Sequence, residues 1–177
     1  SVRCGKDTLG PMPTGGGKCI TFQVPTLLMP GLCLVITPLS SLMKDQVDNL
    51  KVRGINATTV YTGMTREEIS TQLEDCIFGK YKFLYISPER LNSELFRSKL
   101  RAMNVSLLVV DESHCISQWG YDFRPSYLHI ARIREMLPEV TILAITATAT
   151  PEVVNDIQEK LLFRKKNVFQ KSFARRN

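Results

Sequence analysis

Cysteine and histidine are scarce and scattered in this sequence. The chain of 177 residues holds five cysteines and two histidines, and no two cysteines form a CxxC pair. A zinc-binding module needs clustered cysteine and histidine ligands, and a disulfide framework needs closely spaced cysteines. We therefore expect neither a zinc site nor a disulfide framework from the composition, and a reducing intracellular compartment is the simpler expectation.

Long apolar runs are also missing. No stretch reaches the ~20 consecutive apolar residues that a transmembrane helix needs, and the N-terminus lacks the pattern of a signal peptide. We therefore expect a soluble protein without a membrane partner, in the cytoplasm or nucleoid of a bacterium or the nucleus of a eukaryote. The length suits one globular domain, and there is no internal repeat or low-complexity segment.

Acidic residues are outnumbered by basic ones. The chain has 23 lysines and arginines against 17 aspartates and glutamates, which gives a net charge of +6. This surplus suits a polyanionic partner such as nucleic acid, although many basic proteins bind none. The basic stretch 164–176 is compatible with a phosphate contact or with a solvated tail.

Short apolar runs alternate with helical patterns along the whole chain. The expected strands are nearly continuous in apolar character, which favours a parallel sheet covered on both faces. They comprise residues 32–36, 57–61, 83–86, 107–110 and 140–145, and the expected helices comprise residues 18–28, 40–53, 65–78, 93–103, 127–137 and 151–161. The sequence therefore predicts an α/β fold with a mostly parallel sheet and helices on both faces.

Three local signals refine this prediction. Thr65 and Glu68 fit a capping box, and Thr150 before Pro151 fits a capping hydroxyl followed by proline at the first helical position. Gly10 and Pro11 fall where the first strand is expected, and proline removes a donor from the ladder of a sheet. The first strand is therefore predicted to be short or bent.

The glycine-rich stretch MPTGGGKC (12–19) leads into the first expected helix. Glycine amides can approach a phosphate closely, and the start of a helix presents positive charge to an anion. Lys18 is placed to reach the terminal phosphates of a nucleotide. The candidate nucleotide-binding residues are therefore Thr14, Gly15, Gly16, Gly17, Lys18 and Cys19, and the alternative is a flexible loop.

Cys19 stands where the general pattern GxxxxGK[ST] has serine or threonine, and Met12 stands where it has glycine. The missing hydroxyl normally ligates Mg²⁺, which prefers hard oxygen ligands over a thiol. Cys19 is therefore expected to be a weak Mg²⁺ ligand.

A second motif, LLVVDESH, ends an apolar strand in two acids. Asp111 could hold the metal ion, and Glu112 could polarise the water that attacks a phosphoryl group. His114 could couple this motif to the next one or could be an ordinary structural histidine. Taken alone, the acids could also be a polar strand end with a helix cap; the glycine-rich stretch favours the catalytic interpretation.

Five segments follow in a recognisable order: MPTGGGK, TPLSSLMKDQV (37–47), SPER (87–90), DESHCISQWGYDFRP (111–125) and AITATAT (144–150). Their order and spacing resemble the first RecA-like lobe of the RecQ-type superfamily 2 DNA helicases over essentially the whole chain. The resemblance implies a RecA-like P-loop NTPase fold, ATP and Mg²⁺ as cofactors, and 3′ to 5′ translocation on single-stranded DNA driven by ATP hydrolysis. It implies Lys18, Asp111, Glu112 and His114 as catalytic residues.

By the same resemblance, the stretch SQWGYDFRP (117–125), called the aromatic-rich segment below, senses single-stranded DNA and signals to the ATP site. Trp119, Phe123 and Arg124 would carry this contact, helped by Tyr121 and Tyr127, because aromatic faces stack on bases and arginine adds a cation–π contact. A buried aromatic cluster is the alternative. The family usually has histidine in place of Tyr121, so the signal could be altered here.

The resemblance also implies that Thr37, Pro38, Ser41 and Lys44 contact the DNA backbone. Hydroxyls, helix-start amides and a lysine suit phosphate contacts, which position the protein without reading sequence. An ordinary helix start with a solvated lysine is the alternative.

The resemblance leads us to expect an ATP-binding lobe in residues 1–171, with a truncated N-terminal motif, and the start of a linker to a second RecA-like lobe in residues 172–177. The lobe alone should be largely inactive, because a missing arginine finger costs ~10³–10⁵ in turnover. The partners would be that second lobe and single-stranded or partly duplex DNA.

Two rival functions remain: a non-catalytic nucleic-acid-binding module that lost metal chemistry through Cys19, and a P-loop kinase or GTPase. The chain has no NKxD motif, which argues against the GTPase interpretation.

Overall fold

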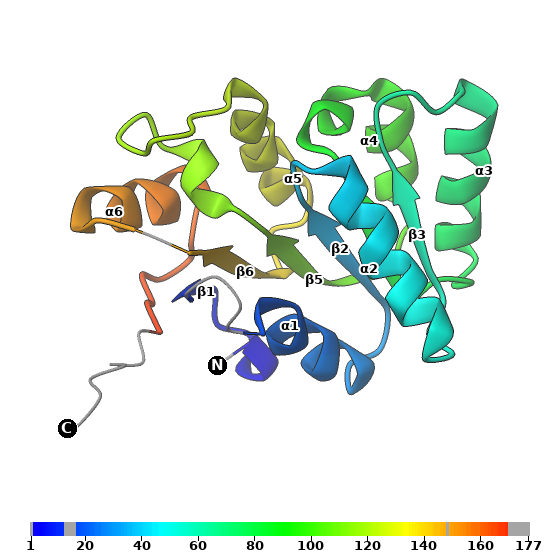
Figure 1. The fold of residues 1–177 in the computed structure, drawn as a ribbon, viewed down its shortest axis with the longest axis horizontal. Coiled ribbons are helices and arrows are strands. Elements are labelled where there is room, and N and C mark those ends of the chain that lie inside the picture. Colours follow the sequence, from blue (N-terminus) through cyan, green and yellow to red (C-terminus); the bar gives the residue numbers. More distant parts are fainter. Residues whose placement is uncertain (1, 13–16, 148, 170–177) are drawn as a thin grey trace.

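A computed structural model describes residues 2–12, 17–147 and 149–169 of the chain. The candidate phosphate-loop residues Thr14, Gly15 and Gly16 and the expected linker 172–177 lie outside these residues. Six parallel strands form one sheet in the order β1-β6-β5-β2-β4-β3 (Figure 1). They are β1 (Thr8–Pro11), β2 (Leu32–Ile36), β3 (Ala57–Val60), β4 (Phe83–Ile86), β5 (Val105–Val110) and β6 (Thr141–Thr146).

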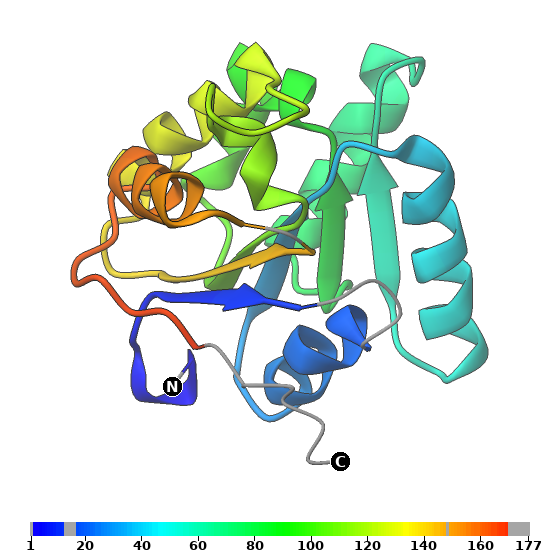
Figure 2. The ribbon, with the colours of Figure 1, turned by 60° about the vertical axis from the view of Figure 1, so that its left-hand side comes forward.

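The described residues form six α-helices. These helices cover the two faces of the sheet, as Figures 1 and 2 show from two directions. They are α1 (Lys18–Leu27), α2 (Ser40–Val52), α3 (Arg66–Ile77), α4 (Glu94–Leu100), α5 (Ile130–Met136) and α6 (Pro151–Lys160). On β2, Cys33 and Val35 share a core with α1 and α2, whereas Leu34 and Ile36 share a core with α3 to α6. Because both faces are buried, every residue of β2 is apolar, and the predicted α/β architecture is confirmed.

Two predicted helices differ from the structure by more than one residue at an end. The segment expected to be helical over 127–137 begins with the 3₁₀ helix η4 (Pro125–His129), which precedes α5. The segment expected over 93–103 is α-helical only to Leu100, because the next amides bond three residues back and tighten into a turn. Both differences are local to helix ends, where the hydrogen-bond pattern changes.

The predicted local signals are present. The Thr65 hydroxyl accepts from the Glu68 N–H while the Glu68 carboxylate accepts from the Thr65 N–H, which completes the capping box at the start of α3. Thr150 caps α6. Strand β1 has four residues and lies at the end of the sheet order, where proline is tolerated. In the part of the chain that the structure describes, no helix is long and apolar enough to cross a membrane.

A buried ionic cluster joins β1 to the end of the described chain. The carboxylate of Asp7 accepts hydrogen bonds from Arg134 Nη2 at 2.8 Å and from the backbone N–H of Arg164 at 2.8 Å. It also accepts from the N–H of Ile142 at 3.0 Å. The side chain of Asp7 is fully buried and that of Arg134 is 4% exposed. This cluster fixes β1, β6 and α5 relative to one another.

Candidate nucleotide and nucleic-acid site

The residues predicted to carry chemistry gather at one edge of the sheet. Parallel strands end at the same edge, and ligands of open α/β sheets bind there. The glycine-rich loop follows β1, Thr37 follows β2, and Asp111 follows β5. Thr146 is the last residue of β6, between β1 and β5 in the sheet. Segments far apart in the sequence are thus brought to one site.

Lys18 and Glu112 meet at this edge. Lys18 begins α1 directly after Gly17, whose φ of 70° lies in the left-handed region that favours glycine. The Nζ atom of Lys18 lies 3.6 Å from Oε1 of Glu112. Both side chains are largely buried, with 16% of Lys18 and 28% of Glu112 exposed. The lysine of the glycine-rich stretch and the acidic motif therefore belong to a single site.

Asp111 is held by its neighbours at the end of β5. The Glu112 N–H donates to Asp111 Oδ1 at 2.9 Å, and the Thr37 hydroxyl donates to Oδ2 at 3.4 Å. Burial and the adjacent charge of Glu112 raise the pKa of Asp111 above its ordinary value. Two neighbouring carboxylates, one of them in a desolvated position, are stabilised by a cation, so the pair fits a Mg²⁺ ion bound through oxygen.

Cys19 lies in the same region but offers different chemistry. Burial, and then the negative charge of Asp111, raise the pKa of its thiol above the ordinary value. The side chain therefore stays protonated at neutral pH and is a poor ligand for a hard cation. The expectation of a weak Mg²⁺ ligand at this position stays a prediction.

Glu112 and His114 connect the acidic motif to the end of β6. Glu112 adopts φ 48°, ψ 44°, a left-handed conformation that is uncommon for residues other than glycine and marks strained functional positions. His114 Nδ1 lies 2.9 Å from the Thr146 hydroxyl and 3.4 Å from Glu112 Oε2. Burial lowers the pKa of His114, so the imidazole is neutral at physiological pH. This geometry suits the predicted coupling role of His114.

The aromatic-rich segment presents two rings to solvent. Trp119 is 76% exposed and Tyr121 is 77% exposed, which argues against a wholly buried aromatic cluster. The ring of Tyr121 stacks on the imidazole of His114, with centroids 4.8 Å apart. Phe123 and Arg124 are partly buried. Exposed rings next to the acidic motif are suited to contact a base and to transmit that contact.

The expectation that Tyr127 helps to stack on DNA bases is wrong. Its side chain is fully buried, and its hydroxyl donates to the backbone carbonyl of Asp111 at 2.9 Å. Tyr127 therefore positions the end of β5. Its sequence context cannot reveal this, because the partner lies 16 residues away.

Two residues of the aromatic-rich segment were not predicted to have a role. A side chain at Gly120 would place its Cβ 3.0 Å from the carbonyl oxygen of His114, so the turn leaves little room for a side chain there. The carboxylate of Asp122 accepts from Arg124 Nη2 at 3.2 Å. Both residues fix the turn that presents Trp119.

The residues predicted to contact the DNA backbone divide into two groups. Ser41 and Lys44 are exposed in the first half of α2, and Pro38 is partly exposed just before it. Lys44 Nζ lies 4.7 Å from the centroid of the Tyr61 ring. Thr37 is buried and bonds to Asp111, so its side chain faces the acidic site.

Known proteins with similar sequences and folds identify the family. The family model of the DEAD/DEAH box helicases matches residues 1–157. The ATP-dependent DNA helicase RecQ of Bacillus subtilis is 49% identical over 94% of this chain, and the probable ATP-dependent DNA helicase RecS of that organism is 44% identical over 91%. The chain spans 28% and 32% of the lengths of these relatives.

The fold is also similar to that of a solved helicase. The crystal structure of the Hef helicase domain of Pyrococcus furiosus has a TM-score of 0.68 at 20% identity, over 94% of this chain and 35% of that one. The RecA-like fold implied by the sequence resemblance is thereby confirmed. The chain belongs to the DEAD/DEAH box helicase family, and within that family its sequence groups with the RecQ helicases.

Proposed function

We propose that this chain is the ATP-binding lobe of an ATP-dependent DNA helicase that moves 3′ to 5′ along single-stranded DNA. The observation that carries the proposal is the 3.6 Å approach of Lys18 Nζ to Glu112 Oε1. ATP hydrolysis needs a cation that binds the phosphates and a carboxylate that activates the attacking water. The two groups must lie within the length of one triphosphate. Few binding functions would require this pairing at the start of a helix.

Each residue of the site has a defined task in this proposal. Lys18 and the amide of Gly17 bind the terminal phosphates, and Glu112 orients the attacking water and accepts its proton. Asp111 would hold Mg²⁺, which when bound neutralises charge on the phosphates. Tyr127 and Thr37 keep Asp111 in place through their hydrogen bonds. His114, neutral and bonded to Thr146, relays changes in this site to β6.

The DNA contact is proposed for the exposed part of the aromatic-rich segment and the start of α2. Trp119 would stack on a base, supported by Phe123 and Arg124, while Ser41 and Lys44 contact phosphates. The stack of Tyr121 on His114 supplies a physical connection from the DNA to the acidic motif. A second RecA-like lobe and single-stranded or partly duplex DNA are the proposed partners.

The decisive comparison is between Cys19 and Cys19→Ser in a protein that joins this lobe to a second lobe. We expect DNA-stimulated, Mg²⁺-dependent ATP hydrolysis with cysteine, and faster hydrolysis with serine because its hydroxyl is a harder ligand. The lobe alone should hydrolyse almost no ATP. Activity with serine and none with cysteine would favour a non-catalytic DNA-binding module. Robust DNA-stimulated turnover by the lobe alone would contradict the proposed division of labour.

A further inference from the structure

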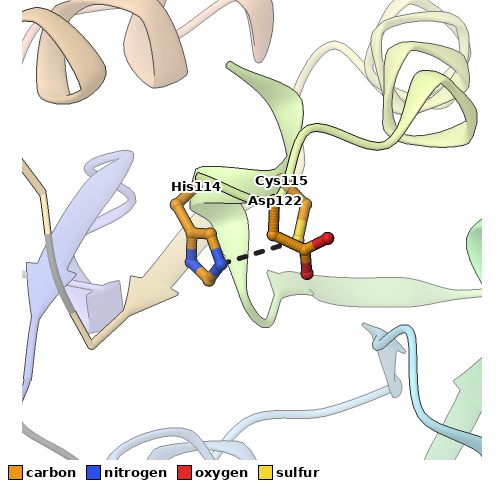
Figure 3. Close-up of side chains that lie close together, drawn as sticks. All are labelled: His114, Cys115 and Asp122. Atoms are coloured by element: carbon orange, nitrogen blue, oxygen red, sulfur yellow. Dashed lines mark hydrogen bonds between the residues drawn. The ribbon is translucent and has the colours of Figure 1, made fainter. Parts of the chain in front are cut away.

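Three side chains with metal-binding atoms converge where the aromatic-rich segment meets the residues just before it. His114 and Cys115 come from the 3₁₀ helix η3 (Ser113–Ile116), and Asp122 comes from the loop that follows it (Figure 3). The Nε2 atom of His114 lies 3.7 Å from Cys115 Sγ, and the thiol donates to Asp122 Oδ2 at 3.8 Å. All three ligand atoms lie within 4.8 Å of one another.

The two separations from Cys115 Sγ are close to those of a tetrahedral zinc site. Zinc binds sulfur at ~2.3 Å and nitrogen or oxygen at ~2.0–2.1 Å, so two ligand atoms of a tetrahedral site lie ~3.5 Å apart. A sulfur, an imidazole nitrogen and a carboxylate oxygen form a ligand set that a soft or borderline cation prefers to Mg²⁺. From this geometry we propose that His114, Cys115 and Asp122 form a Zn²⁺ site that is separate from the proposed Mg²⁺ site.

The orientation of His114 suits this role. Its Nδ1 atom faces the Thr146 hydroxyl and the Glu112 carboxylate, so a proton on Nδ1 has an acceptor. The Nε2 lone pair then points toward Cys115, as in zinc sites where a carboxylate or hydroxyl orients the ligating histidine. Glu112 and Thr146 thus act as the orienting groups, and a water molecule completes four ligands.

Binding requires two local exchanges. Burial, and then the charge of Asp122, raise the pKa of Cys115 to about 12, so the metal ion displaces the thiol proton and one proton is released. Arg124 donates from Nε and Nη2 to the same oxygen of Asp122 that accepts from the thiol. Asp122 and Arg124 are 43% and 35% exposed, so both can move. The ion would therefore hold the loop to η3 and release Arg124.

Cobalt(II) is the probe for this site in the purified chain, because Zn²⁺ itself gives no visible spectrum. We expect one Co²⁺ per chain, with thiolate-to-metal charge-transfer absorption and the intense visible bands of tetrahedral coordination, both abolished by Zn²⁺ and unaffected by excess Mg²⁺. Cys115→Ser and Asp122→Ala should remove the spectrum, and Cys4→Ser, which alters an exposed cysteine, should leave it intact. Circular dichroism checks the folding of each variant.

Trp119 gives a second readout. It is the only tryptophan of the chain and lies between Cys115 and Asp122 in the sequence, so Zn²⁺ should change its emission in the unaltered chain and not in Asp122→Ala. Because Asp122 is partly exposed, that variant decides the matter if Cys115→Ser fails to fold. The proposal is overturned if no charge-transfer absorption develops, if it survives Cys115→Ser, or if Asp122→Ala leaves both signals unchanged. These outcomes do not depend on ATP hydrolysis.

Discussion

Replacing Glu112 by glutamine is expected to lower DNA-stimulated ATP hydrolysis by ~10²–10⁴-fold in a protein that joins this lobe to a second lobe. The amide keeps the size of the side chain but cannot accept a proton from the attacking water. It also loses the charge that faces Lys18 at 3.6 Å, so ATP affinity should be kept or improved. Steady-state turnover and ATP binding are measured on the same preparation.

The matched control for this change is Glu135→Gln, since Glu135 is exposed on α5. Its turnover should equal that of the unaltered protein. A Glu112→Gln protein that still hydrolyses ATP within tenfold of the normal rate, a factor that corresponds to ~1.4 kcal/mol, would show that another group activates the water.

Replacing Asp7 by asparagine is expected to lower the free energy of unfolding of the chain by about 3–5 kcal/mol. The change leaves the buried guanidinium of Arg134 without its anionic partner and weakens the bonds from Arg164 and Ile142. Domains are stable by only ~5–15 kcal/mol, so this loss is large. Urea denaturation followed by circular dichroism measures it. Asp75→Asn, which breaks an exposed ion pair with Lys80, should leave the midpoint nearly unchanged.

The same cluster predicts how stability depends on pH. Burial alone would raise the pKa of Asp7, but hydrogen bonds from Arg164 and Ile142 and the charge of Arg134 outweigh it and hold the pKa below its ordinary value. The folded state therefore binds the proton less readily than the unfolded state. The stabilisation is fully present above about pH 4 and is lost as the pH falls through the folded-state pKa. Asp7→Asn should remove this acid-induced loss, and a variant that retains it would contradict the assignment.

The sequence predicts those parts of the fold that depend on neighbouring residues. Buried strands such as β2 are evident from continuous apolar runs, and Thr65 marks the start of α3 through its capping box. Contacts between distant residues leave no such pattern. Arg134 meets Asp7 across 127 residues, and the inward direction of Tyr127 depends on the carbonyl of Asp111, just after β5. Interleaved aromatic residues look alike in the sequence whether they face a base or the core.

In the candidate site, too, local motifs are predictable from the sequence and contacts between distant residues are not. The motifs predicted Lys18, Asp111 and Glu112 because their chemistry requires those residue types at strand and helix ends. Thr37, by contrast, is predicted to contact DNA but supports Asp111, because it directly follows β2, which pairs with β5. In the sequence, Asp122 is an acidic residue close to Arg124, a pattern that is common on protein surfaces. Its convergence with Cys115 is visible only in three dimensions.

The central claim is that Lys18 and the acids at the end of β5 bind one magnesium–triphosphate. Calorimetric titration of ATP onto the chain, with and without Mg²⁺, tests it directly. Mg²⁺ should tighten ATP binding to the unaltered chain, Asp111→Asn should abolish that gain, and Lys18→Ala should weaken binding in both conditions. Full retention of the Mg²⁺ gain in Asp111→Asn, or unchanged affinity in Lys18→Ala, would contradict the claim.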